Sequence, residues 1–231
     1  MGGCDLESLE YGCHKVSAGG RECYMFRDMR RYGRDPNIVR RAKPATFTAP
    51  LRWKDPRRIF TCSWSDFFIE EADAWRHDAF DIIRAAPRHT YQILTKRIER
   101  VIPFNFPNVW LGVSVEDRKA KGRIDQLREL HGMALRFLSI EPLIEDIGEL
   151  DLRGIGWVIV GGESASDCHA RGFDIEWARS IVGQCKASGV PCFVKQLGSR
   201  PTIAIRDNKG GDWAEWPADL RVREFPTEEL A

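Results

Sequence analysis

The sequence predicts an α/β fold and, within that class, a single-domain (β/α) barrel that is partial rather than closed. Two observations support this: six short apolar runs alternate with helix-length stretches, and polar residues follow every run. The runs lie at residues 58–63, 91–94, 109–113, 135–138, 157–160 and 191–194. Such alternation indicates parallel βαβ units, which wind right-handed into a barrel or a doubly wound sheet. Polar residues at every strand end favour the barrel, whose functional face lies there, and the doubly wound sheet is the alternative.

Helices are expected between these runs and before the first of them. Residues 24–32 place Met25, Phe26 and Met29 at helical spacing, and Gly33 ends the segment. Further helices are expected at residues 74–86, 124–130 and 175–188. Residues 1–12 predict no regular element, and residues 34–54, which hold three prolines, predict a loop over a rim of the barrel.

A chain of 231 residues is long enough for one α/β domain with a substantial core. We assign residues 1–205 to the barrel with its N-terminal cysteine loop, and residues 206–231 to an irregular C-terminal extension. Turn-forming residues at 208–211, followed by Trp213 and Trp216, indicate that this extension is packed but has no regular repeat.

Composition and charge make several classes of protein improbable. The chain has 43% hydrophobic and 30% charged residues and a net charge of +1, which is ordinary for a globular protein. No run approaches the roughly 18 apolar residues of a membrane span, and the first residues lack a signal-peptide pattern, so we expect a cytoplasmic protein without membrane contact. Seven cysteines, an odd number in a long chain, argue against a disulfide framework.

A basic segment spans Arg27 to Arg41, with six arginines against Asp28 and Asp35. Such a segment is most often a solvated helix face and its loop. The alternative is a binding surface, either for the phosphates of nucleic acid or for a partner protein.

The charged and polar residues that follow the apolar runs would converge on one rim of a barrel. They are Asp66, Lys96, Arg97, Glu116, Asp117, Glu141, Glu163, Lys195 and Gln196. Lys96 and Arg97 suit a carboxylate or phosphate, and Glu141 and Glu163 suit an amine or ribose hydroxyls. The set therefore predicts a site for a polar ligand, although each residue alone is more simply a cap or an ion-pair partner.

Cys13 and Cys23 bracket a loop of small and polar residues just before the first helix. Thiolates bind soft metals and iron–sulfur clusters, and a cluster held by three cysteines leaves one iron open. Cys4 is a candidate third ligand, and a zinc site formed with His14 is a further alternative. From the residues alone, Cys13 and Cys23 are more simply free thiols.

The chain resembles the phage-associated three-cysteine-motif family of unknown function, which is related to the radical S-adenosylmethionine enzymes. The shared blocks lie at residues 12–17, 23–24, 50–53, 63–66, 94–97, 109–117, 139–143, 160–164 and 195–196. They begin with Gly12-Cys13-His14-Lys15-Val16-Ser17 and include Leu94-Thr95-Lys96-Arg97 and Val160-Gly161-Gly162-Glu163-Ser164. The blocks occur in order along most of the chain.

The resemblance implies a radical-SAM-like partial TIM barrel with a [4Fe–4S] cluster on the cysteine loop. The open iron would bind S-adenosylmethionine, with Ser65 and Asp66 near its amino group and the other rim residues around it. Reductive cleavage would then give a radical that abstracts hydrogen from an unknown substrate. The phage association points to modification of a nucleotide or nucleic acid.

The sequence departs from the family pattern where the middle cysteine is expected. Gly20 stands three residues before Cys23, and the segment 8–11 replaces a Trp-Asn-Pro-like stretch. Without a third thiolate, the alternative function is a metal-free barrel that binds nucleic acid or protein through the Arg27–Arg41 segment.

Overall fold

The computed structural model describes residues 5–7, 10–165 and 169–227. Within these residues, seven strands form one sheet in which every neighbouring pair is parallel. The strands are β1 (Asp5–Glu7), β4 (Arg58–Thr61), β5 (Thr90–Thr95), β6 (Phe106–Ser114), β7 (Met133–Ile140), β8 (Trp157–Gly161) and β9 (Cys192–Gln196). The last six correspond to the six predicted runs, and β1 lies in a segment for which the sequence predicts no regular element.

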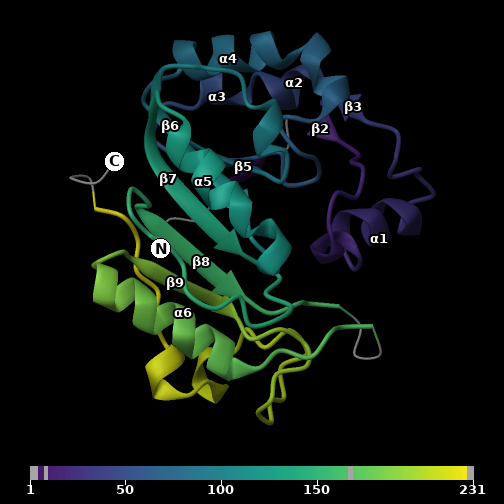
Figure 1. Cartoon of the computed structure of the whole chain (residues 1–231). Helices are drawn as coiled ribbons and strands as arrows, with labels where there is room; N and C mark the ends of the chain where they lie inside the picture. The colour runs from purple at the N-terminus through teal and green to yellow at the C-terminus, as the bar shows by residue number, and fades with distance from the viewer. Residues whose placement is uncertain (1–4, 8–9, 166–168, 228–231) are drawn as a thin grey trace.

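The order of the strands decides between the two predicted topologies. Along the sheet they follow β1-β4-β5-β6-β7-β8-β9, which is their order in the chain. In a doubly wound sheet the spatial order of the strands reverses at a switch point, whereas in this sheet the order never reverses. The sheet curls into a half-barrel (Figure 1), and no pairing between described residues joins β1 to β9. The prediction of a partial α/β barrel is confirmed at this level.

The two faces of the sheet bury different side chains because residues alternate along each strand. Val109, Leu111 and Val113 of β6 are fully buried in the large core that also contains the apolar residues of the covering helices. Trp110 points to the opposite face, where it packs with Phe137 and Trp157 in a separate cluster.

The predicted helices are present with small shifts at their ends. They are α1 (Tyr24–Arg31), α4 (Arg76–Ala85), α5 (Gly122–Glu129) and α6 (Ile175–Ser188). Gly33 ends α1 with a φ of +65°, and Gly189 ends α6 with a φ of +66°. Both glycines therefore act as left-handed helix stops.

The prediction of a loop over residues 34–54 is wrong in detail. This segment contains β3 (Arg40–Arg41), which pairs antiparallel with β2 (Glu10–Tyr11), and the short helices α2 (Pro44–Phe47) and α3 (Ala49–Arg52). Two of the prolines that indicated a loop occupy the first turns of these helices, where the missing N–H carries no penalty. Short 3₁₀ turns occur at Ala18–Gly20, Glu70–Ala74, Ile98–Arg100, Arg118–Lys121, Trp213–Glu215 and Ala218–Leu220.

The C-terminal segment packs along the last strand of the sheet. The amide of Val194 donates to the carbonyl of Val222 at 2.9 Å, and the amide of Glu224 donates to Cys192 at 2.9 Å. Trp216 is buried in the large core. None of the described helices is long and apolar enough to cross a membrane.

Candidate ligand site at the carboxyl ends of the strands

The cysteine loop, residues 12–23, is attached to the carboxyl ends of several strands. Arg97, after β5, donates to the carbonyl of His14 at 2.9 Å. Ser17 donates to the carboxylate of Glu116, after β6, and Arg171 donates to the carbonyl of Ala18 at 2.9 Å. The loop therefore lies over the rim at which the sequence predicts a ligand site.

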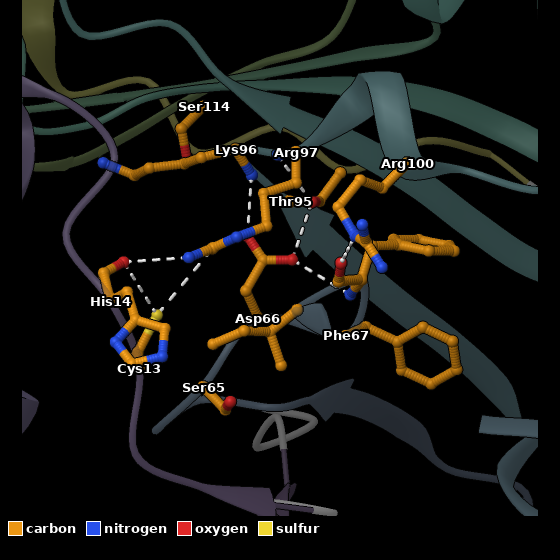
Figure 2. Close-up of polar contacts among 12 residues, drawn as sticks. Cys13, His14, Ser65, Asp66, Phe67, Thr95, Lys96, Arg97, Arg100 and Ser114 are labelled. Carbon is orange, nitrogen blue, oxygen red and sulfur yellow. Dashed lines mark hydrogen bonds and ion pairs between the residues drawn. The ribbon is translucent and has the colours of Figure 1, made fainter. Parts of the chain in front are cut away.

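Asp66, after β4, organises the first part of this rim (Figure 2). Its Oδ1 accepts from the Thr95 hydroxyl at 2.7 Å and the Phe68 amide at 3.0 Å. Its Oδ2 accepts from the Lys96 amide at 2.9 Å and the Arg97 guanidinium at 3.1 Å. Both oxygens thus have two protein donors, and the carboxylate fixes Arg97 against the cysteine loop.

Arg97 connects Asp66 to the first cysteine. Its Nη1 lies 3.8 Å from the Sγ of Cys13, as Figure 2 shows. Burial alone would lower the pKa of Arg97, but the charges of Asp66 and Cys13 outweigh it and raise that pKa. Ser65 anchors the start of the cysteine loop, because its hydroxyl donates to the carbonyl of Gly12 at 2.7 Å.

Glu116 is the centre of the second part of the rim and is 0% exposed. Its Oε1 accepts from Ser17 and Lys96, and its Oε2 accepts from Arg123 at 2.9 Å. Burial alone would raise the pKa of Glu116, but Lys96, Ser17 and Arg123 together lower it below its ordinary value. The carboxylate is therefore ionised and held entirely by protein groups.

The loop approaches Glu116 so closely that only glycine fits at residue 19. A Cβ on Gly19 would lie 2.5 Å from the Cγ of Glu116. The neighbouring predicted residue, Asp117, faces elsewhere and accepts from the amide of Ala120 at 2.9 Å, capping the following 3₁₀ turn.

The third part of the rim, at β7 and β9, is more open. The Nζ of Lys195 lies 3.0 Å from Oε2 of Glu141, and the amide of Gln196 donates to Oε1 of Glu141 at 3.1 Å. The side chain of Lys195 is 56% exposed, so its ammonium is accessible to a ligand from solvent. Gln196 also donates to the carbonyl of Gly162 at 2.8 Å and accepts from Ser164.

Glu163, after β8, is buried and paired with Arg171. Burial would raise the pKa of Glu163, but the hydrogen bonds and charge of Arg171 outweigh it and lower that pKa. Since Arg171 also donates to Ala18, this pair is another attachment of the cysteine loop.

A family model described as "Protein of unknown function (DUF5131)" matches residues 9–216. The chain belongs to this family. No match was found among curated proteins or among solved structures.

In this DUF5131 protein the two loop cysteines are neighbours. Cys13 and Cys23 are both free and half-buried, and both pack against the apolar face of α1. Burial raises the pKa of the Cys13 thiol to about 11, Arg97 opposes this, and the charges of Asp66 and Cys23 add to it. Burial and the charges of Cys23 and Glu141 raise the pKa of Tyr24 to about 12.

The described residues do not fit a cluster held by three cysteines. Cys4 lies outside the described residues, and within them no group of three His, Cys, Asp or Glu side chains could hold a metal ion. His14, a candidate ligand only in the alternative zinc site, has its Nε2 2.5 Å from the carboxylate of Glu71. A Cβ on Gly20 would lie 3.6 Å from the side chain of Lys15, which leaves room for a cysteine there.

Three residues of this site were not singled out from the sequence as binding groups: Ser17, Arg123 and Arg171. Ser17 lies within the cysteine loop, and its hydrogen bond to Glu116 can be predicted only once the loop is known to cover Glu116. Arg123 and Arg171 follow their partners by 7 and 8 residues, a spacing with no characteristic meaning.

Proposed function

We propose that this chain is a radical-SAM-like half-barrel that binds a polar ligand at its rim without a cluster held by three cysteines. The observation that carries the proposal is the cysteine loop itself. Its described part offers the thiols of Cys13 and Cys23, and glycine occupies position 20, where the resemblance implies the third. The serial order of the parallel strands and the attachment of the loop to their carboxyl ends support the radical-SAM-like origin.

We place the ligand at the β7–β9 part of the rim, against Glu141, Lys195 and Gln196. Asp66 and Glu116 are already bonded by protein donors, so a ligand amine would have to displace Lys96, Arg97 or Arg123. Glu141 also accepts from Lys195 and Gln196, but the side chain of Lys195 is 56% exposed, so a ligand can reach this pair from solvent. The charges of the pair match a ligand carrying both a carboxylate and an amine. S-adenosylmethionine carries both groups and is the first ligand to test.

A second candidate is a cluster-containing enzyme, related to phages, that modifies a nucleotide or nucleic acid. The proximity of Cys13 and Cys23 beneath α1 favours it. It requires a third ligand, for which Cys4 is the candidate, and it makes the opposite prediction about metal content.

Iron and sulfide content after anaerobic reconstitution separates the two candidates. We would compare the natural chain with Gly20→Cys and with Gly20→Ser, which adds a side chain of similar size without a thiol. Our proposal expects cluster iron only in Gly20→Cys, at about four irons per chain. About four irons in the natural chain would refute it, and Cys4→Ala would then test the third ligand.

Calorimetric titration with S-adenosylmethionine tests the ligand site independently of iron. Glu141→Gln and Lys195→Gln should each weaken binding by roughly tenfold or more, because each removes one member of a charge-assisted contact. Lys186→Gln, on the exposed side of α6, is the matched control and should leave binding unchanged. Binding that resists both rim substitutions would contradict this placement of the ligand.

A further inference from the structure

Helix α1 has one face that is buried and one that is exposed to solvent. Met25, Phe26 and Met29 are buried beside the cysteine loop. Arg27, Arg30 and Arg31 are exposed on the remaining surface of the helix. Figure 1 shows α1 on the side to which the arrowheads of β7 and β8 point.

The arginines at the end of this helix have no charge partners among the described residues. Arg27 pairs with Asp28, and Arg41 pairs with Asp78 at 2.7 Å. By contrast, no described carboxylate or carbonyl accepts from the guanidinium groups of Arg30, Arg31 and Arg34. Although Asp35 follows directly, three arginines within five residues that form no ion pair with a described residue make this end of the helix locally positive in a chain with a net charge of +1.

The backbone holds this patch in a defined shape. The amide of Arg34 donates to the carbonyl of Met29 at 2.9 Å around the left-handed Gly33, a motif that terminates helices. The turn therefore keeps the backbone of Arg34 beside the last turn of α1, which carries Arg30 and Arg31. We call Arg30, Arg31, Tyr32 and Arg34 the α1 patch.

An aromatic ring lies within the same patch. Tyr32 is 67% exposed, which leaves most of its ring in contact with solvent. Cations at the end of a helix stabilise its dipole, and this alone would account for one or two arginines. It does not account for an exposed tyrosine between them. An exposed ring in the same turn as three exposed arginines offers a stacking surface for a base and charges for neighbouring phosphates.

We propose that the α1 patch binds single-stranded nucleic acid, with Arg30, Arg31 and Arg34 contacting phosphates and Tyr32 stacking on an unpaired base. An anionic membrane is a poorer match, because a membrane-binding helix inserts its apolar face and that of α1 is buried. An acidic peptide would satisfy the arginines but gives no role to the exposed ring. The proposal does not depend on whether the cysteine loop holds a cluster.

Fluorescence anisotropy with labelled oligothymidylate and oligouridylate tests the phosphate contacts. The variant Arg30→Gln/Arg31→Gln/Arg34→Gln removes the patch charges from exposed positions. The control Lys119→Gln/Lys186→Gln/Lys209→Gln removes the same charge from exposed positions elsewhere. At about 50 mM salt we expect the patch variant to bind at least roughly tenfold more weakly and the slope of log K against log salt to fall by about 2. The control should stay within about twofold of the natural chain.

Substitutions of Tyr32 test the stacking contact. Tyr32→Ala should weaken binding roughly tenfold, Tyr32→Phe should bind like the natural chain, and a duplex of the same sequence should bind less tightly than either single strand. The proposal is overturned if the natural chain does not bind either strand, or if the lysine control loses as much affinity as the patch variant. It is equally overturned if polyglutamate competes as well as oligothymidylate, which would indicate an acidic protein partner.

Discussion

Replacing Glu116 with glutamine removes one buried negative charge while keeping the shape of the side chain. In the natural protein this carboxylate accepts from Ser17, Lys96 and Arg123. The glutamine oxygen can replace only one side of the carboxylate, and its amide would face Lys96 or Arg123 as a second donor. Both cations would then lack their counter-charge.

The expected loss of stability follows from the burial of these groups. Breaking a buried ion pair by removing one partner costs about 3–5 kcal/mol. The side chains of Lys96 and Arg123 are 24% and 14% exposed, so water can partly solvate them, and we expect about 2–4 kcal/mol. For a chain of this size, each kcal/mol lowers Tm by about 2–4 °C, so a loss of about 3 kcal/mol gives a fall of roughly 6–12 °C.

Urea and thermal unfolding of Glu116→Gln would be measured beside Glu129→Gln, the same change at an exposed position. Ser17→Ala isolates the loop attachment and should cost only about 1 kcal/mol, because it removes a single hydrogen bond. Both Glu116→Gln and Ser17→Ala should speed the reaction of Cys13 with a thiol reagent by freeing the loop. A Glu116→Gln protein as stable as Glu129→Gln, with unchanged thiol reactivity, would refute the idea that Glu116 holds the loop.

Three further predictions concern the same loop. Gly20→Cys should change stability by less than about 1 kcal/mol, because the nearest atom to its Cβ would be 3.6 Å away. Gly19→Ala should cost about 1–3 kcal/mol, because its Cβ would clash with Glu116. Urea unfolding measures both changes, and equal stabilities of the two variants would contradict the prediction. Because folding lowers the pKa of Glu116, its ionisation contributes fully to the free energy of unfolding above the ordinary pKa of a glutamate, and this contribution is lost as pH falls below that value. Urea midpoints measured between about pH 6 and pH 3 should therefore fall less steeply in Glu116→Gln than in the natural chain. In Cys23→Ser, alkylation of Cys13 by iodoacetamide should keep rising toward about pH 11, and a plateau near pH 8 would rule out the raised pKa.

The sequence is a good guide to the position of each rim residue and a poor guide to its partner. The apolar runs fix where β6 ends, and Glu116 follows that end as expected. Its contact with Ser17 joins residues 99 positions apart, and no periodicity carries that information. Strand β1 was missed for a related reason, because three residues are too few to show alternation.

The short helices between residues 44 and 52 show a different limit. Pro44 and Pro50 are loop signals when only composition is considered, and they are favourable when they occupy the first turn of a helix. Which of the two applies depends on the packing of Phe47, which is fully buried in the large core. Tertiary burial therefore decided the local structure.

The tail that packs along β9 affects how an unclosed barrel avoids aggregation through its edge strand. An exposed edge strand offers unpaired amides and carbonyls to another chain and is a template for aggregation. Here the amide of Val194 and the carbonyl of Cys192 are bonded to the tail, through Val222 and Glu224. The C-terminal segment thus shields the edge that a complete barrel would have paired with its first strand, and its removal would expose β9 to intermolecular pairing.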